Sequence, residues 1–529
     1  MTETPASMTY ASVVLRDSVR IALTIAALNE LEVMAGDIQN AYLTAPCKEK
    51  ITITCGPEFG EDEGKTAEIV RALYGLKSSG AAYGEHLANC LTHLGFQTCL
   101  ADNDVWIKAQ TKPDGTEYYA YILVYVDDIL VIHHDAKKIL SQIDYFFRMK
   151  PESMGDPDIY LGCKLRRHVV AGSGVQAWLQ SPSKYIQEAV RNAEAYYTER
   201  FQSKFPNKVS SPFATGYRPE MDITKELNTE DASYYQSQIG VLRWIVEIGR
   251  IDIITEVSLL ASQMAMPREG HMMQVFRCFA YLKARHNGCI VFDPSYPDMS
   301  EFTFETGQDW VRTYGKVEEP IPGNAPVARG KPVQLRLFVD SDHAGEELTR
   351  RSRTGYIIYM NSAPILWHSK RQGTVETSVF GAEFVAMKTG NEASRGLRYK
   401  LRMMGIPLDG LTYIFGDNMS VIHNTQRPES VLKKKSIAIC YHFMRESVAM
   451  GECLTAHIRS EDNPADLCTK VMAGGQKRDR LVDMVLHYAT GESTVSSVKT
   501  TMSVKMLERA KQLIKDQERN TSSRPGRTG

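Results

Sequence analysis

The sequence predicts an α+β chain of several domains, divided by a linker into two parts. Its 529 residues are enough for about three to four globular units. A hydrophobic fraction of 43% with 24% charged residues is ordinary for folded proteins, which excludes a disordered or collagen-like chain. Residues 293–334 are rich in Pro, Gly and acidic residues, and we expect this segment to be the linker.

Helical and β-prone patterns both occur before the linker. Three segments carry apolar residues at helical spacing and are predicted to be helical, namely 18–34, 184–200 and 234–286. Two β-prone runs, 120–126 and 129–132, are separated only by Asp127 and Asp128. This pattern predicts a β-hairpin that carries both acids at its turn.

The second part alternates between strands and helices. The predicted elements are strands at 335–340, a pair of strands within 354–368, a helix at 379–404, a strand at 411–416 and a helix start at 463–470. Such a sequence of elements is typical of a compact α/β domain. From residue 476 we expect a polar tail, in which 506–514 keep helical spacing.

Composition excludes several classes of function. The formal net charge of −1 gives the whole chain no basic excess for nucleic acid, so any such binding must use local patches. The ten cysteines contain no C-x-x-C pair, which favours free thiols in a reducing compartment over zinc sites or disulfides. The N-terminus has no signal-peptide pattern, and the longest apolar stretch is broken by two aspartates. We therefore expect an intracellular protein, neither secreted nor membrane-embedded.

Three acids of the first part are candidate metal ligands. Placing Asp127 and Asp128 inside an apolar hairpin is costly unless a cation compensates their charge. For a lone pair of aspartates, an exposed turn is the simpler interpretation. Asp37, ninety residues upstream, ends another apolar segment. Two-metal phosphoryl transfer needs carboxylates that converge from separate elements, so the three acids together are candidate ligands.

Four acids of the second part occupy similar positions on predicted elements. Asp340 and Asp417 end strands, Glu383 lies on a helix, and Asp466 opens a helix. Each has a structural interpretation, because Asp favours strand ends and the first turn of helices. Their neighbours Asp342 and Asp462 are expected to be exposed.

The motifs around these acids resemble a known family. Tyr125-Val-Asp-Asp128 and Asp37-Ile-Gln-Asn-Ala-Tyr42 resemble signatures of reverse transcriptases, and Arg71-Ala-Leu-Tyr-Gly-Leu-Lys77 and Tyr160-Leu-Gly162 follow in the order found in copia-type retrotransposon polyproteins. Phe338-Val-Asp340, Ala382-Glu-Phe384, Gly416-Asp-Asn418 and Ala465-Asp-Leu-Cys-Thr-Lys470 resemble the ribonuclease H domain that follows copia-type polymerases.

The resemblance implies a right-hand polymerase palm and thumb with truncated fingers, followed by an α/β ribonuclease H-like domain. The expected domains are 1–170 (fingers remnant and palm), 171–215 (thumb), 216–292 (connection region), 293–334 (linker), 335–475 (ribonuclease H-like domain) and 476–529 (polar tail with a candidate helix).

The resemblance also implies the chemistry of both sites. Asp37, Asp127 and Asp128 would hold two Mg²⁺ ions in the polymerase, and two further ions would lie among the four acids of the ribonuclease, which are Asp340, Glu383, Asp417 and Asp466. Tyr42 would exclude ribose from the nucleotide site, the alternative being a core tyrosine, and Lys77 would approach phosphate, the alternative being a solvated surface lysine. The implied partners are a primed RNA or DNA template, deoxynucleoside triphosphates, an RNA–DNA hybrid and other retroelement products.

Two departures from the family leave a second function open. Only 36 residues precede Asp37, where the family carries additional fingers strands, and Tyr83 stands where the family commonly has Trp. The alternative to an active reverse transcriptase and ribonuclease H is therefore a catalytically impaired or co-opted remnant, which would retain only ribonuclease activity or nucleic-acid binding.

Overall fold

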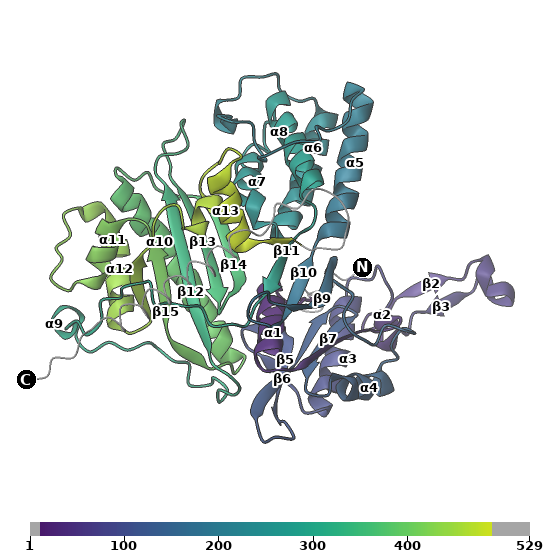
Figure 1. The fold of residues 1–529 in the computed structure, drawn as a ribbon. Coiled ribbons are helices and arrows are strands. Elements are labelled where there is room, and N and C mark those ends of the chain that lie inside the picture. The colour runs from purple at the N-terminus through teal and green to yellow at the C-terminus, as the bar shows by residue number, and fades with distance from the viewer. Residues whose placement is uncertain (1–10, 489–529) are drawn as a thin grey trace, which may run out of the picture. The chain divides into compact units, whose positions relative to one another are not determined.

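The computed structural model describes residues 11–488, and their apolar side chains form a large core cluster that runs from Val14 to Leu486. Three five-stranded sheets and one two-stranded sheet organise this part of the chain (Figure 1). The predicted α+β class is confirmed. The candidate helix at 506–514 lies outside the described residues.

The first sheet is antiparallel, and we call it the palm sheet because it lies in the segment expected to be the palm. Its strand order is β1-β7-β6-β5-β4, with β1 Glu32–Asp37, β4 Gln97–Cys99, β5 Asp102–Thr111, β6 Glu117–Tyr125 and β7 Asp128–His133. Helix α4 (Ala136–Phe146) packs on β1 and β7. The helix expected at 18–34 is shorter than predicted, because α1 spans Arg16–Leu28 and Glu30 turns the chain with φ +53° into β1. The strand pairing of β1 overrides the helical spacing there.

The predicted hairpin is confirmed as β6 and β7. Tyr125 pairs with Asp128 across the turn, so Val126 and Asp127 are the two turn residues. Val126 has φ +57°, a conformation that is strained for a β-branched residue. Such strain persists where the surrounding structure fixes the backbone, which is common at functional sites.

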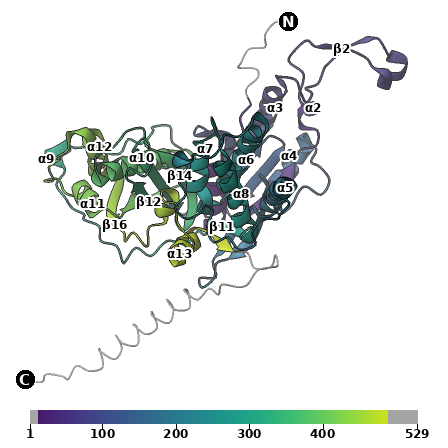
Figure 2. The ribbon, with the colours of Figure 1, turned by 90° about the horizontal axis from the view of Figure 1, so that it is seen from above.

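A projecting arm between the helices α2 and α3 was not predicted. Strands β2 (Thr52–Thr54) and β3 (Thr66–Glu68) pair outside the palm sheet, and the views from the side and from above both show them reaching away from it (Figures 1 and 2). The arm leaves the short helix α2 (Ala41–Thr44) and returns to α3 (Ser79–His93).

The second sheet connects the palm with a group of helices. Its order is β17-β11-β10-β9-β8, with β8 Ile159–Tyr160, β9 Cys163–Val169, β10 Gln176–Ser181, β11 Gly288–Phe292 and β17 His487–Tyr488. The helices that follow are α5 Ser183–Phe201, α6 Thr229–Glu247, α7 Ile254–Ala261 and α8 Glu269–Ala284. Helix α5 packs on α8, so the helices predicted at 184–200 and within 234–286 form one bundle.

The third sheet is mixed and lies in the second part of the chain. Its order is β14-β13-β12-β15-β16, with β12 Val333–Asp342, β13 Arg353–Met360, β14 Ala363–Arg371, β15 Leu408–Gly416 and β16 Cys453–His457. The first three strands are antiparallel, whereas β15 runs parallel to β12 and β16 parallel to β15. Helix α10 (Val379–Met403) packs on β12, β13 and β15, with α11 (Met419–Gln426) and α12 (Ala438–Ala449) beside it.

The segment expected to be a linker is largely irregular and packs against the third sheet and its helices. It contains the short helix α9 (Val311–Tyr314). The Glu319 carboxylate accepts hydrogen bonds from the guanidinium groups of Arg398 and Arg402 at 2.6–2.8 Å. The linker is therefore held along α10 over part of its length.

The polar tail expected from residue 476 begins later than predicted. Helix α13 (Gln476–Val485) is packed, and its Arg478 is 2% exposed and donates to the Asp252 carbonyl at 2.6 Å. Strand β17 pairs with β11 of the second sheet. The prediction of a polar tail was wrong here because α13 is rich in charged residues, and the sequence pattern does not show that Arg478 is buried.

Further contacts join the two parts of the chain. The Lys400 ammonium lies 2.8 Å from the Asp17 carboxylate, and the Arg20 guanidinium lies 3.8 Å from the centre of the Trp367 ring. The Tyr121 hydroxyl donates to the Met404 carbonyl at 3.0 Å. The second part of the chain is thus packed directly on α1 and the first sheet.

Candidate active sites

The palm sheet brings the three predicted acids of the first part together. Strand β1 is antiparallel to β7, and Asp37 stands directly opposite Asp128. The Ile38 N–H donates to the carbonyl oxygen of Asp127 at 2.9 Å, which ties the end of β1 to the hairpin turn. Residues paired in this way have Cα atoms about 5 Å apart, so Asp37 and Asp128 lie side by side at the end of the sheet, with Asp127 in the adjoining turn.

The electrostatics of this centre favour a bound cation. Burial, reinforced by the charges of Asp127 and Asp37, raises the pKa of Asp128 to about 6. The Asp37 Oδ1 atom is buried and accepts no hydrogen bond within the described part of the chain. A buried carboxylate oxygen without a donor is unusual, and a metal ion would satisfy it. These residues therefore fit the metal that the sequence implied.

Lys150 is a member of this centre that sequence reasoning missed. Its ammonium lies 2.6 Å from Asp37 Oδ2 and 3.9 Å from Asp127 Oδ2. Lys150 follows β1 by more than a hundred residues, and its own backbone N–H donates to the Asp37 carbonyl at 2.7 Å. No local pattern marks it, because it stands in an irregular segment after α4.

We expect Lys150→Met to tighten divalent-metal binding at the polymerase centre by about fivefold. The lysine places a positive charge beside two ligands, and a partly exposed charge at this distance is worth about 1 kcal/mol. The measurement is calorimetric titration with Mn²⁺ in a Glu383→Gln background, which weakens the other centre. Lys137→Met, an exposed lysine on α4, is the matched control. Equal or weaker binding in the Lys150 variant would contradict this prediction.

The two predicted nucleotide-site residues lie in different surroundings. Tyr42, on α2, is partly buried, and its ring centre lies 4.4 Å from that of Tyr74 and 5.8 Å from that of Tyr83. Lys77 is exposed at the start of α3 and forms no ion pair with the three acids of this centre in the described structure. Their roles toward a nucleotide stay predictions.

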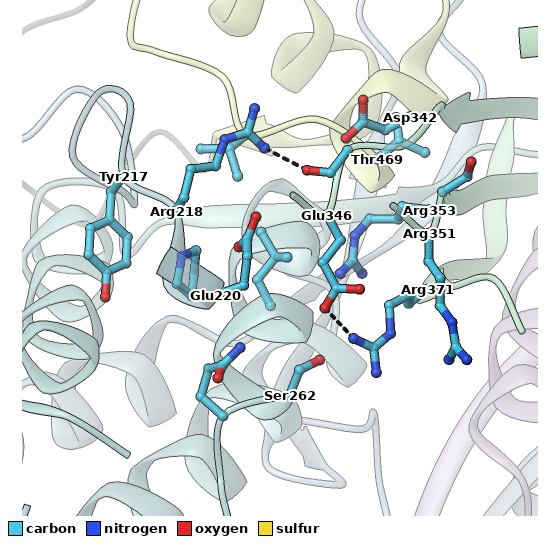
Figure 3. Close-up of a pocket in the computed structure, with 16 residues that line it drawn as sticks. Tyr217, Arg218, Glu220, Ser262, Asp342, Glu346, Arg351, Arg353, Arg371 and Thr469 are labelled. Atoms are coloured by element: carbon cyan, nitrogen blue, oxygen red, sulfur yellow. Dashed lines mark hydrogen bonds and ion pairs between the residues drawn. The ribbon is translucent and has the colours of Figure 1, made fainter. Parts of the chain in front are cut away.

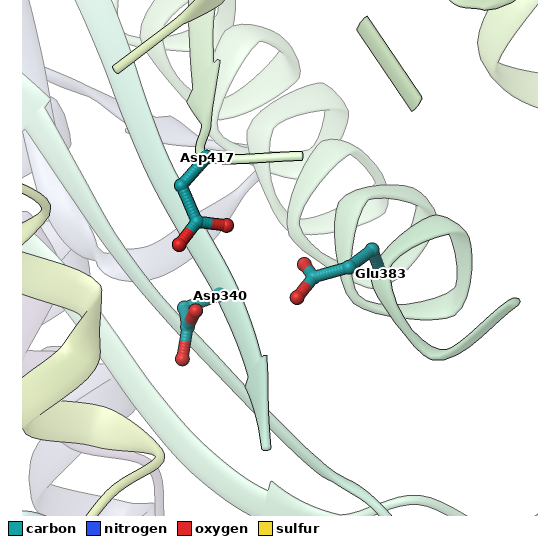
Figure 4. Close-up of side chains that lie close together, drawn as sticks. All are labelled: Asp340, Glu383 and Asp417. Atoms are coloured by element: carbon teal, nitrogen blue, oxygen red, sulfur yellow. The ribbon is translucent and has the colours of Figure 1, made fainter. Parts of the chain in front are cut away.

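The ribonuclease H-like domain brings three of its four predicted acids together. Asp340 lies on β12, Glu383 on the first turns of α10, and Asp417 directly after β15. Each offers a carboxylate oxygen, and these oxygens all lie within 4.8 Å of one another. Figure 4 shows the three carboxylates pointing toward a common space. Oxygen ligands at this spacing suit Mg²⁺.

The fourth acid, Asp466, lies beside this cluster but is neutralised by lysines. It is fully buried in the 3₁₀ helix Pro464–Cys468, and its oxygens accept from Lys470 at 2.6 Å and Lys477 at 2.7 Å. The Lys470 ammonium also lies 3.2 Å from Asp340 Oδ1. Lys470 thus joins the fourth acid to the other three, and the role of Asp466 as a metal ligand stays a prediction.

Burial and mutual repulsion disfavour the charged forms of these acids. Burial raises the pKa of Asp340 to about 6, although the nearby Lys470 opposes the shift. Burial, with the charges of Asp340 and Asp417, raises the pKa of Glu383 well above its ordinary value. A divalent cation would reverse both shifts by stabilising the ionised carboxylates.

We expect three acids to contribute less to the stability of the metal-free protein as pH rises from about 4 through 6. The folded state keeps protons on Asp340, Glu383 and Asp128 that the unfolded chain releases, so their contribution to the free energy of unfolding falls in this interval. Mg²⁺ should therefore raise the melting temperature more at pH 7.5 than at pH 5. Thermal unfolding with Mg²⁺ or with EDTA measures the difference, and an equal effect of Mg²⁺ at both pH values would contradict it.

Asp342 and Asp462 are less exposed than predicted. Asp342 lines a cavity of about 40 Å³ between the loop 217–220, α7 and the start of β13, and burial raises its pKa (Figure 3). The Asp462 side chain is 17% exposed and pairs with Arg459 and Arg480. Positively charged neighbours and contacts with other elements cover both acids, which sequence position alone does not indicate. The lining of the cavity includes none of the three clustered acids.

Comparison with known proteins agrees with this arrangement. Residues 4–196 match the family model described as reverse transcriptase (RNA-dependent DNA polymerase). The Pol polyprotein of transposon RE1 from Arabidopsis thaliana is 25% identical over 468 residues, which is 88% of this chain and 28% of that protein. The chain is a relative of copia-type Pol polyproteins.

A second relative and a solved structure are also similar to parts of this chain. The Pol polyprotein of transposon TNT 1-94 from Nicotiana tabacum is 25% identical over 473 residues, covering 88% of this chain and 31% of that protein. Among solved structures, LC11-RNase H1 in complex with an RNA/DNA hybrid matches 26% of this chain and 94% of that chain, with 16% identity and a TM-score of 0.22. The chain spans less than a third of the length of both Pol polyproteins.

The lengths of the helices bear on whether the chain could cross a membrane. Among residues 11–488, none of them combines the length and the apolar character needed to cross a bilayer.

Proposed function

We propose that this chain synthesises DNA on primed RNA and DNA templates and degrades the RNA strand of RNA–DNA hybrids, as part of a copia-type retrotransposon. One observation carries the proposal, namely that acids far apart in the sequence meet at two places: Asp340, Glu383 and Asp417 form a carboxylate cluster, and Asp37 pairs with Asp128 beside Asp127. Buried carboxylates that repel one another are costly, and paired divalent cations explain both clusters with one chemistry. We expect the protein to act inside the cell, in a cytoplasmic particle or in the nucleus.

In this proposal each cluster serves one reaction. Asp37, Asp127 and Asp128 hold two Mg²⁺ ions for synthesis, and Asp340, Glu383 and Asp417, with Asp466 beside them, hold two for cleavage. Bound Mg²⁺ supplies the charge that activates the attacking oxygen and stabilises the phosphate.

The protein's own residues supply specificity. In this proposal the Tyr42 ring excludes the 2′-hydroxyl of a ribonucleotide, and the exposed Lys77 ammonium approaches the triphosphate. In the ribonuclease, contacts with the 2′-hydroxyl restrict cleavage to the RNA strand.

The proposal is tested by two assays on one preparation. Extension of a labelled DNA primer on RNA and on DNA templates measures synthesis, and cleavage of a labelled RNA strand in a hybrid measures the ribonuclease, each with Mg²⁺ and with EDTA. We expect both activities, and both should require the metal. Cleavage without extension would instead support a ribonuclease-only remnant, and the absence of both would support a remnant without turnover.

A further inference from the structure

Tyr74 is an exposed aromatic residue to which the sequence patterns assigned no role. It lies in the turn between the arm and α3, and 64% of it is exposed. Gly75, directly after it, has φ +99°, a conformation that turns the chain back toward α3 and that glycine adopts without strain. An exposed tyrosine at a fixed turn calls for a structural or binding explanation.

The Tyr74 ring covers the Tyr42 ring. The two ring centres lie 4.4 Å apart with planes inclined by 37°, while Tyr83 lies 5.8 Å from Tyr42. Tyr83 is 3% exposed and is itself supported edge-on by Phe147 at 6.4 Å. Tyr42 thus has a buried ring as one neighbour and the exposed Tyr74 ring as another.

The backbone fixes this arrangement. The segment after α2 and the segment before Tyr74 are joined by hydrogen bonds, from the Ala72 N–H to the Ala45 carbonyl at 3.1 Å and from the Cys47 N–H to the Val70 carbonyl at 3.1 Å. The Arg71 guanidinium also donates to the Thr44 carbonyl at 3.1 Å. Tyr74 therefore stays beside α2, although the arm itself projects away.

Tyr74 also lies within electrostatic reach of the polymerase acids. Partial burial, followed by the negative charges of Asp127 and Asp37, raises the pKa of the Tyr74 hydroxyl. The same ring therefore contacts Tyr42 and borders the acidic centre.

We propose that Tyr74 is a positioning residue that fixes the Tyr42 ring, so that selection of deoxynucleotides over ribonucleotides depends on both tyrosines. A ring excludes a 2′-hydroxyl only if it cannot swing aside. Tyr83 supports Tyr42 from within the core, and Tyr74 restricts its remaining freedom from the solvent side. This inference rests on the proposed polymerase function and on the role of Tyr42 within it.

The test compares nucleotide selectivity among variants. The ratio of kcat/KM for a deoxynucleotide to that for the matching ribonucleotide is measured for the unsubstituted protein, Tyr74→Ala and Tyr74→Phe. We expect Tyr74→Ala to lower the ratio by about threefold to tenfold, which is the range that an aromatic pair supplies. Tyr74→Phe should keep the ratio, because the ring and not the hydroxyl makes the contact. Tyr145→Ala, which removes an 85% exposed tyrosine on α4, is the matched control and should change nothing.

A double substitution shows whether Tyr74 affects nucleotide selectivity through Tyr42. If Tyr74 acts through Tyr42, Tyr74→Ala should have no further effect on selectivity in a Tyr42→Val background. Thermal unfolding and hybrid cleavage of Tyr74→Ala show whether the chain is folded. An active Tyr74→Ala protein with unchanged selectivity, or an equal loss in both backgrounds, would overturn the inference alone. An unsubstituted protein that extends no primer would refute the proposed polymerase, and the inference with it.

Discussion

Glu383→Gln is expected to abolish hybrid cleavage, by at least about 100-fold, and to leave primer extension intact. The substitution replaces a charged ligand with a neutral amide of nearly the same shape, so the metal loses charge stabilisation worth about 3 kcal/mol or more. Glu383 is 5% exposed and lies on α10, among the three carboxylates of its cluster. Cleavage of a labelled hybrid and extension of a primer, measured on the same preparation, give the two rates.

The same helix offers a matched control for this substitution. Glu392 also lies on α10, but its side chain is 47% exposed and pairs with Lys388 at 2.7 Å. Glu392→Gln should leave both activities unchanged, because an exposed ion pair contributes only about 0.5 kcal/mol. Since removal of a buried charge relieves repulsion, Glu383→Gln should also melt no earlier than the unsubstituted protein in EDTA. Loss of extension together with cleavage would contradict two independent centres.

Asp127→Asn is expected to have the reverse effect, a loss of extension of at least about 100-fold with cleavage preserved. Asp127 is a turn residue of the β6–β7 hairpin, and asparagine keeps the turn while removing the charge. In the proposed reaction Asp127 would help to hold a metal ion that activates the primer end, and asparagine would hold that ion more weakly. Primer extension over a range of Mg²⁺ concentrations separates weaker metal binding from a slower chemical step.

The control for Asp127→Asn is another turn of the same sheet. Asp114 lies between β5 and β6, and its Oδ1 accepts a hydrogen bond from the Thr116 N–H at 2.8 Å, which an asparagine also accepts. Asp114→Asn should therefore leave both activities unchanged. Primer extension at the normal rate by the Asp127→Asn protein would show that this hairpin does not carry the proposed polymerase centre.

Local signals account for the parts of the site that the sequence predicted. Asp127 and Asp128 interrupt an apolar run, and the amino-acid sequence alone shows this conflict between charge and expected burial. Asp340 and Asp417 end strands that the alternating pattern also marks, and the parallel pairing of β12 with β15 brings the two strand ends together. The motif resemblance added Glu383, which a helical pattern alone would not distinguish from other glutamates.

Other parts of the fold depend on tertiary contacts that the pattern of neighbouring residues in the sequence does not indicate. Strands β2 and β3 have only three residues each and are largely exposed, so they show no alternation. Lys150 and Lys470 are ordinary lysines until the fold places them between carboxylates. Arg478 belongs to a charged helix, and its burial is set by the partner that it meets, the carbonyl of Asp252. These positions follow from tertiary packing, which overrides composition.

The pairing of β17 with β11 affects how the chain would respond to a protease. A cut in the Pro- and Gly-rich segment before β12 would sever the backbone, yet β17, α13 and the contacts of α1 with Trp367 and Lys400 would still bind the two pieces to each other. The nicked halves should therefore elute together from a sizing column under native conditions and separate only in denaturant.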